Sequence, residues 1–276
     1  MILFGNRFIP KEHLRISPDD RGYYFGDGIY EVIRVYEGRF YEMAAHMNRL
    51  QRSAREARIP LPYSTAELER LLEQLVHKNG LVTGTVYVQI TRGEAPRAHA
   101  FPGDARPVVY GYCNEVPRPH RMMERGIRAI TLEDVRWLRC DIKSLNLLGN
   151  VLAKQEALDR GTDEAILHRG GTVTECSASN VMMFKDGKIF THPANHLILH
   201  GVTRAVTLNL ARRLGMEIDE TPFHVDELKR ADEVWITGTT VEITPVVQVD
   251  GQPVGDGRPG PVVRKLQQAF ERTIWQ

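Results

Sequence analysis

The sequence predicts a mixed α/β fold, and three observations support this prediction. A chain of 276 residues is long enough for one large or two modest domains. Stretches in which apolar residues alternate, as they do in strands, occur between stretches with the helical period of 3.6 residues. The composition, with 42% hydrophobic and 26% charged residues, is ordinary for a globular protein with a buried core.

The first part of the chain is predicted to combine strands with helices. Its predicted strands share alternating apolar residues or a tight connecting turn, and they cover residues 32–36, 40–41 and 84–91. Its two predicted helices share the helical period, and they cover residues 42–57 and Ser64 to about His77. Glu67 follows Ser64 by three residues, which is the pattern of a capping box. A long loop is expected at 92–107, and loops of that length are usually functional or disordered.

The second part of the chain is predicted to begin after a linker at 118–121, because two prolines in this region disfavour a helix and favour an extended chain. The predicted domains are therefore residues 1–117 and 122–276. The helices expected in the second domain run from Ser144 or Asn146 to Gly161, from Thr203 to Leu214, and from about 261. The expected strands lie near 164–168, 181–185, 188–191, 216–220, 233–237 and 244–249.

Charge and composition indicate which kinds of binding partner and which cellular compartment to expect. The formal net charge is +1 and the basic residues are scattered, so we expect a small-molecule partner and no binding of nucleic acid or membrane. Three cysteines far apart, Cys113, Cys140 and Cys176, indicate neither a disulfide framework nor a zinc site. The N-terminal apolar run is too short for a signal peptide, and no stretch approaches the ~20 apolar residues of a membrane span. A cytoplasmic location is therefore expected.

Two other motifs do not carry a function. His192, His196 and His200 are spaced by four residues, but a proline and an asparagine between them oppose a helix, so we predict no metal site. Gly26-Asp27-Gly28 supplies only two glycines of a dinucleotide-binding fingerprint.

Lys143 is the first candidate for chemistry. It lies between the apolar Ile142 and Leu145, just before the expected start of a helix. Burial and the positive end of a helix would both disfavour the ammonium form, and an unprotonated amine is what Schiff-base formation requires. Without further context, a surface lysine with a buried stem would be the more common explanation.

Five further stretches lie around this lysine in a fixed order. They are Phe25-Gly26-Asp27-Gly28-Ile29-Tyr30-Glu31, His46-Met47-Asn48-Arg49-Leu50, Val173-Thr174-Glu175-Cys176-Ser177-Ala178-Ser179-Asn180, Gly201-Val202-Thr203-Arg204 and Thr237-Gly238-Thr239-Thr240. Together with the Lys143 segment, they resemble the fold-type IV pyridoxal-phosphate transaminases, a family that includes D-amino-acid and branched-chain transaminases. The similarity runs from about Gly22 to Asp250, and the combination is highly specific.

The resemblance implies two α/β domains with pyridoxal 5'-phosphate in the cleft between them and Lys143 as its lysine. Glu175 would face the pyridine nitrogen and keep it protonated, so that the ring can accept electrons. Arg49 would bind the phosphate through two charge-assisted hydrogen bonds. Without the resemblance, a solvated glutamate and a surface arginine would be the common explanations. Further phosphate contacts are expected at a helix start and after a buried strand, from Val202, Thr203, Thr239 and Thr240.

The sequence of the loop at 92–107 indicates the class of substrate. It resembles the loop with which D-amino-acid transaminases bind the α-carboxylate of the substrate, and Arg97 and His99 match both binding positions. Residues two apart in an extended segment point the same way, so both side chains could converge on one anion. Tyr30 matches the third carboxylate contact of the family. In those relatives the loop reaches the active site of the neighbouring subunit, which implies a homodimer with shared sites.

The implied reaction is a ping-pong transamination of D-amino acids, such as D-alanine, with a 2-oxo acid such as 2-oxoglutarate. The nearest alternatives have the same fold: a branched-chain L-amino-acid transaminase or an aminodeoxychorismate lyase. A more distant alternative is a non-catalytic binding protein that keeps the fold. Lys143, Glu175 and Arg49 are all present, which argues against the last alternative.

Overall fold

The computed structural model describes residues 1–275, and the chain forms two compact units, each with its own sheet. The first unit comprises Met1–Arg118 together with Ile142–Leu147, and the second comprises Pro119–Asp141 and the chain from Leu148 onward. Both units combine helices with a sheet, so the prediction of a two-domain α/β protein is confirmed.

The first unit is built on a six-stranded antiparallel sheet with the strand order β2-β1-β6-β5-β3-β4. Its strands are β1 (Ile2–Phe4), β2 (Arg7–Ile9), β3 (Gly28–Tyr36), β4 (Arg39–Phe40), β5 (Gly84–Thr91) and β6 (Val108–Glu115). Its helices are the 3-10 helix η1 (Lys11–His13), α1 (Arg21–Phe25), α2 (Met43–Ala57) and α3 (Thr65–Asn79).

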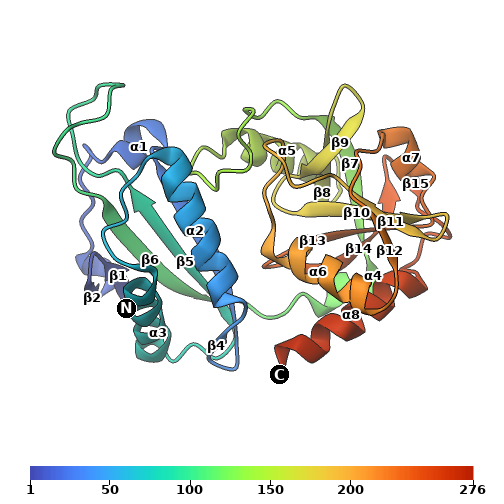
Figure 1. Cartoon of the computed structure of the whole chain (residues 1–276), viewed down its shortest axis with the longest axis horizontal. Coiled ribbons are helices and arrows are strands. Elements are labelled where there is room, and N and C mark those ends of the chain that lie inside the picture. The colour runs from blue at the N-terminus through green and yellow to red at the C-terminus, as the bar shows by residue number, and fades with distance from the viewer. Residues whose placement is uncertain (276) are drawn as a thin grey trace. The chain divides into compact units, whose positions relative to one another are not determined.

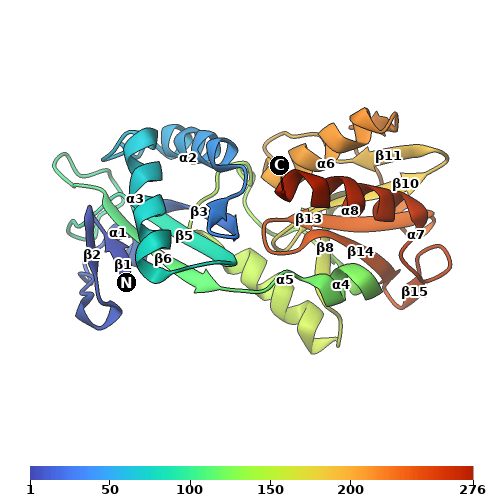
Figure 2. The ribbon, with the colours of Figure 1, turned by 90° about the horizontal axis from the view of Figure 1, so that it is seen from below.

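Helices α2 and α3 cover one face of this sheet (Figure 1, Figure 2). Alternate residues of β3, such as Ile29 and Ile33, are fully buried against the helices, as the two-residue period of a strand requires. The predicted capping box is present at the start of α3, where Ser64 and Glu67 bond reciprocally. The strand predicted at 84–91 also has its predicted bounds.

The second unit is built on a nine-stranded mixed sheet with the order β12-β11-β10-β13-β14-β7-β8-β9, and β15 pairs with β14. Its strands are β7 (Ile127–Glu133), β8 (Glu164–Arg169), β9 (Thr172–Cys176), β10 (Asn180–Lys185), β11 (Lys188–Thr191), β12 (Glu217–Asp219), β13 (Glu233–Gly238), β14 (Glu242–Val249) and β15 (Gln252–Pro253). Its helices are α4 (His120–Arg125), α5 (Leu148–Asp159), α6 (Val202–Arg213), α7 (Val225–Lys229) and α8 (Pro261–Ile274).

The sheet of the second unit encloses an apolar core. Val181 and Met183 on β10 join this core, together with Ile236 on β13 and Phe223 from the loop before α7. Helices α6 and α8 pack against each other and against β13 and β14 (Figure 1, Figure 2). Among residues 1–275, no helix combines the length and apolar character that crossing a membrane would require.

The chain between the units differs from the prediction in two ways. Helix α4 begins at His120, directly after Pro119, so residues 120 and 121 are helical and not part of an extended linker. Residues 142–147 pack with the first unit, because the Leu145 N–H donates to the Gly28 carbonyl and Ser144 forms a bridge with Ile29. Helix α5 begins only at Leu148, so Lys143 does not stand directly before a helix start as predicted.

A substitution at Gly260 tests how α8 is held in the second unit. The buried Glu233 carboxylate accepts hydrogen bonds from the Val262 and Val263 N–H groups, both at 2.8 Å, and so caps the start of α8. A Cβ at Gly260 would come within 2.2 Å of the Glu233 carboxyl carbon. We expect Gly260→Ala to displace this cap and lower the free energy of unfolding by about 1–2 kcal/mol in urea denaturation.

The control is Gly103→Ala, because a Cβ at that position would meet no atom within 4 Å. Both changes restrict the unfolded chain to a similar degree, so the difference between the variants isolates the contact with Glu233. Equal stabilities of the two variants would contradict the expected role of this carboxylate.

Candidate active site

Lys143 lies against Tyr30 in the first unit. The Tyr30 N–H donates to the Lys143 carbonyl at 3.0 Å, and the Lys143 N–H donates to the Ser53 Oγ at 3.2 Å. The amine nitrogen of Lys143 lies 4.2 Å from the centroid of the Tyr30 ring. Two of the predicted site residues are therefore in direct contact, and the backbone of the lysine is fixed on both sides.

Arg49 lies on α2 at the centre of a buried ion cluster. Its Nε and Nη2 donate to the two carboxylate oxygens of Glu31, each at 2.7 Å. The Nδ1 atom of His46 lies 2.8 Å from the Glu31 carboxylate, and all three side chains are buried. Arg49 thus forms a fork, but on a carboxylate of the protein and not on a phosphate. Phosphate binding by the same guanidinium stays a prediction.

Burial and charge fix the ionisation of this cluster. Burial raises the pKa of Glu31, but the charge of Arg49 and hydrogen bonds from Arg49 and His46 outweigh it and lower the pKa to about 2. Burial lowers the pKa of His46, and this outweighs its bond to Glu31. The nearby charges of Arg49 and Lys143 lower the pKa of His46 further. At neutral pH the cluster is therefore a carboxylate, a guanidinium and a neutral imidazole.

Arg97 and His99 extend from the loop between β5 and β6, and both side chains are exposed. Both lie beside the ring of Phe25, so the structure brings the two predicted carboxylate-binding residues together. Within residues 1–118 and 142–147, no hydrogen bond, ion pair or ring contact joins either side chain to Tyr30 or Lys143. The two residues are therefore not in contact with the amine of their own chain.

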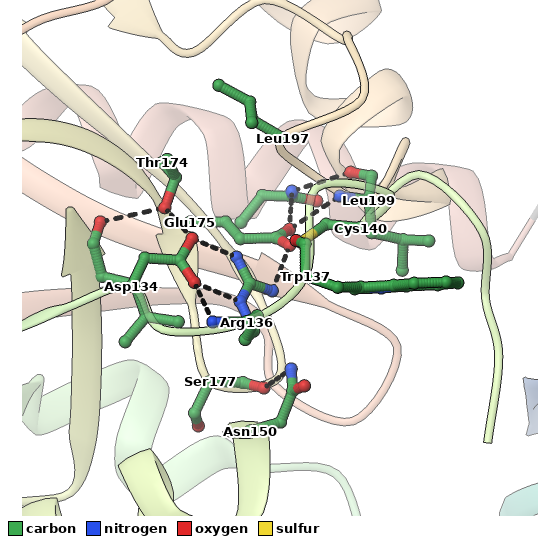
Figure 3. Close-up of polar contacts among 12 residues, drawn as sticks. Asp134, Arg136, Trp137, Cys140, Asn150, Thr174, Glu175, Ser177, Leu197 and Leu199 are labelled. Carbon is green, nitrogen blue, oxygen red and sulfur yellow. Dashed lines mark hydrogen bonds and ion pairs between the residues drawn. The ribbon is translucent and has the colours of Figure 1, made fainter. Parts of the chain in front are cut away.

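Glu175 is the central side chain of a polar cluster in the second unit (Figure 3). It lies on β9 and is 4% exposed. One carboxylate oxygen accepts a hydrogen bond from the Arg136 Nη1 at 2.7 Å. The other accepts from the Asn180 side-chain amide at 2.9 Å and from the Leu199 N–H at 3.0 Å. Three donors from different segments therefore fix both oxygens.

The environment of Glu175 raises the pKa of its carboxyl group from the ordinary range towards neutral pH. Burial raises the pKa of Glu175 to about 7, although the charge and hydrogen bond of Arg136 and the Leu199 N–H lower it. Arg136 is itself shared, because its Nε and Nη2 each bond to Asp134 at 2.9 Å. A cation placed beside such a group would favour its ionised form, which is the chemistry expected of a partner to a protonated ring nitrogen.

The start of α6 offers backbone donors to an anion. Gly201 is the residue before the helix, and among residues 1–275 no side chain caps this helix start. Val202 and Thr203 are buried in its first turn. Thr203 is the second residue of the helix, so it does not stand at the capping position, which Gly201 occupies. Thr239 and Thr240 follow β13, where Thr239 is partly buried and Thr240 is exposed.

Asn180 connects this helix start to Glu175. A Cβ at Gly201 would lie 2.0 Å from the side-chain oxygen of Asn180, so only glycine leaves room for the amide. The same amide donates to Glu175 and to the Leu199 carbonyl. The buried hydroxyl of Thr237, at the end of β13, has no hydrogen-bond partner within residues 1–275. Backbone N–H groups at such a helix start suit an anion.

Four residues of the site were given no role from the sequence: Glu31, His46, Arg136 and Asn180. A signal for Glu31 does exist, because it occupies the same face of β3 as Ile29 and Ile33, where a charged residue must be paired. The other three carry no comparable signal. Leu199 is a further donor of the site, because its N–H donates to Glu175.

Comparison with known proteins identifies the family. A sequence model of the family described as amino-transferase class IV matches residues 28–249. The chain belongs to the class IV aminotransferases. Among curated relatives of this class IV aminotransferase, a D-alanine aminotransferase of Listeria monocytogenes is 49% identical over 99% of this chain and 96% of its own length. A D-alanine aminotransferase of Staphylococcus aureus is 48% identical over 99% and 97%.

Solved structures agree with the family assignment of this aminotransferase. The branched-chain amino acid aminotransferase of Escherichia coli matches with a TM-score of 0.94 and 30% identity, over 98% of this chain and 93% of that one. A second branched-chain amino acid aminotransferase, solved with pyridoxamine 5'-phosphate, matches with a TM-score of 0.92 and 29% identity, over 99% and 93%.

A pH series tests the buried pair in this class IV aminotransferase. The folded pKa of Glu31, about 2, lies below its ordinary value of 4.5, so its contribution to stability is fully present above about pH 4.5 and is lost as the pH falls towards 2. We expect Glu31→Gln to lower the free energy of unfolding by about 3–5 kcal/mol at pH 7, because it leaves Arg49 buried without its anion.

The difference between wild type and Glu31→Gln should narrow as urea denaturation is repeated from pH 5 downward. Glu73→Gln is the control, since Glu73 is exposed on α3. A difference that stays constant across the series would contradict the low pKa of Glu31.

Proposed function

We propose that this class IV aminotransferase transfers the amino group of D-amino acids, such as D-alanine, to a 2-oxo acid, such as 2-oxoglutarate, in a ping-pong reaction. The observation that carries the proposal is 48–49% identity along almost the whole chain to D-alanine aminotransferases. The loop with Arg97 and His99 agrees with it, because two cationic or donor groups beside one another suit the α-carboxylate of an amino acid.

The cofactor is pyridoxal 5'-phosphate, whose ring takes up the electrons released when the Cα–H bond breaks. We propose that the amine of Lys143 binds the cofactor and then moves the proton from the substrate Cα. Glu175 binds the ring nitrogen and holds a proton there. The phosphate is bound by Arg49 and by a second group of donors, which are Val202, Thr203, Thr239 and Thr240.

Three residues of the first unit would bind the substrate carboxylate. The Arg97 guanidinium supplies a fork of two donors, and His99 and the Tyr30 hydroxyl supply one each. Tyr30 lies against Lys143, whereas Arg97 and His99 contact neither residue in their own chain. We therefore propose a homodimer in which the loop of each subunit serves the site of its partner, as the resemblance implies.

An apolar surface on the second unit supports the proposed homodimer. Helix α5 exposes Leu148, Val151 and Leu152, which are 72%, 59% and 58% exposed. The neighbouring loop exposes Val135 and Leu138, and it lies close to α5 because a Cβ at Gly149 would be 3.0 Å from the Arg136 side chain. Contiguous apolar side chains of this kind are usually covered by a partner. We also propose a cytoplasmic location, which the three unpaired cysteines suit.

A branched-chain L-amino-acid transaminase is the second candidate, because two of the solved structures that match are branched-chain amino acid aminotransferases. Incubation with 2-oxoglutarate and either D-alanine or L-leucine separates the two candidates by which 2-oxo acid forms. Formation of pyruvate from D-alanine supports the proposal, and turnover of L-leucine alone would replace it by the second candidate.

Removal of the amine tests the role of Lys143. We expect Lys143→Ala to lose the visible absorbance of lysine-bound cofactor and all measurable transamination, because no other group supplies the covalent link and the proton transfer. The control is Lys265→Ala, since Lys265 is exposed on α8 and should keep both properties. Retention of the absorbance band by Lys143→Ala would exclude this lysine from the role.

Removal of the guanidinium tests the role of Arg97. We expect Arg97→Ala to lower kcat/KM for D-alanine by two or more orders of magnitude, a loss of roughly 3 kcal/mol, because the carboxylate loses a charged partner. Arg106→Ala is the matched control, since Arg106 is an exposed arginine of the same loop. An unchanged rate in Arg97→Ala would mean that the carboxylate is bound elsewhere.

A further inference from the structure

The loop that carries Arg97 and His99 is held in place by buried charges. Arg92 begins the loop, and its guanidinium binds Asp27 as well as the carbonyl groups of Ala57 and Arg58. Its guanidinium carbon also lies 3.6 Å from the centroid of the Phe101 ring, further along the loop. Long loops usually have several conformations. The contacts of Arg92 restrict this loop at its start, and the contact with Phe101 restricts it further along.

The backbone at the predicted carboxylate-binding residues is bound by Arg21. This arginine, on α1, is 3% exposed, and its Nε donates to Asp27 at 2.8 Å. Its Nη1 donates to the Ala98 carbonyl at 2.5 Å, and its Nη2 lies 3.4 Å from the His99 carbonyl. The residue between Arg97 and His99 is thus fixed by a buried guanidinium, which Asp27 holds in turn.

The side chains of Arg97 and His99 share one aromatic surface, the ring of Phe25. The Arg97 guanidinium carbon lies 5.2 Å from the ring centroid, within the range of a cation–π contact. The His99 ring centroid lies 5.5 Å away, with the two planes at 42°. Phe25 is the last residue of α1, and the helix ends there because Gly26 takes up a left-handed conformation with φ of 63°.

We propose that Arg21 and Phe25 are positioning residues that hold Arg97 and His99 in one relative orientation before a substrate carboxylate arrives. Two exposed, flexible side chains would otherwise lose conformational freedom on binding, and this loss weakens affinity. Arg21 fixes the backbone and Phe25 fixes the side chains, so neither needs to touch the substrate. This inference rests on the proposed function, because it assigns to the pair a task in substrate binding.

Steady-state kinetics of Phe25→Leu test the proposal. Leucine keeps an apolar side chain at the end of α1 but removes the ring that both partners contact. At saturating 2-oxoglutarate, we expect KM for D-alanine to rise about tenfold while kcat stays within about twofold, because the carboxylate grip acts on substrate and transition state alike. Phe25→Tyr keeps the ring and should restore KM to near the wild-type value.

Cleavage by trypsin after Arg97 gives a second measurement that does not depend on activity. In the holoenzyme we expect slow cleavage of wild type and about tenfold faster cleavage of Phe25→Leu and Arg21→Lys, because a loop released from its anchor opens more often. Arg21→Lys removes the fork that binds the Ala98 and His99 carbonyl groups. Tyr23→Leu is the control for both measurements, since Tyr23 lies on the same helix and is 81% exposed.

The outcomes separate this proposal from the proposed function. Wild-type KM and wild-type cleavage in Phe25→Leu would overturn the positioning role, even if D-alanine is a substrate. A loss of kcat and thermal stability that Phe25→Tyr does not restore would also overturn it, since the residue would then be only structural. If wild type does not transaminate D-amino acids, the proposed function fails, and faster cleavage in both variants still establishes that Arg21 and Phe25 hold the loop.

Discussion

Each unit of this protein buries a carboxylate against an arginine, and in each unit the candidate site residues lie around that pair. A buried charge is unfavourable unless it is paired and hydrogen-bonded, so each pair fixes the segments that supply it. Glu31 receives a fork from Arg49 and a bond from His46, and its pKa falls to about 2. Glu175 receives one bond from an arginine, and burial raises its pKa to about 7.

The difference between the two carboxylates follows from how each arginine is shared. Arg49 directs two nitrogens to the two oxygens of Glu31, and its charge and hydrogen bonds lower the pKa of that group. Arg136 uses two nitrogens on Asp134 and only one on Glu175, and Asp134 adds a negative charge that raises the pKa of Glu175. Glu31 is therefore a fixed anion suited to holding a cation in place. Glu175 is a group whose proton can be shared with a ligand that approaches it.

The sequence predicted regular elements well and buried charges poorly, for a physical reason. The strand at 84–91 and the capping box at Ser64 depend on local patterns, which neighbouring residues define. The sequence assigned no role to Arg136 or Asn180, because their partners come from segments farther along the chain. The same limit applies to residues 142–147, whose pairing with Gly28 and Ile29 is a long-range contact. Family resemblance supplied Lys143, Glu175 and Arg49, whereas their partners Glu31 and Arg136 had to be found in the structure.

Catalytic and binding groups of this protein are held in two different ways. The carboxylates of Glu31 and Glu175 are buried and bonded on both oxygens. Arg97 and His99 are exposed, as the proposed binding of a substrate carboxylate by these two side chains requires. A buried residue holds this exposed pair instead. Arg21 is buried and binds the backbone between the two residues, and the ring of Phe25 contacts both side chains. The loop can therefore be rigid while the side chains of Arg97 and His99 remain exposed.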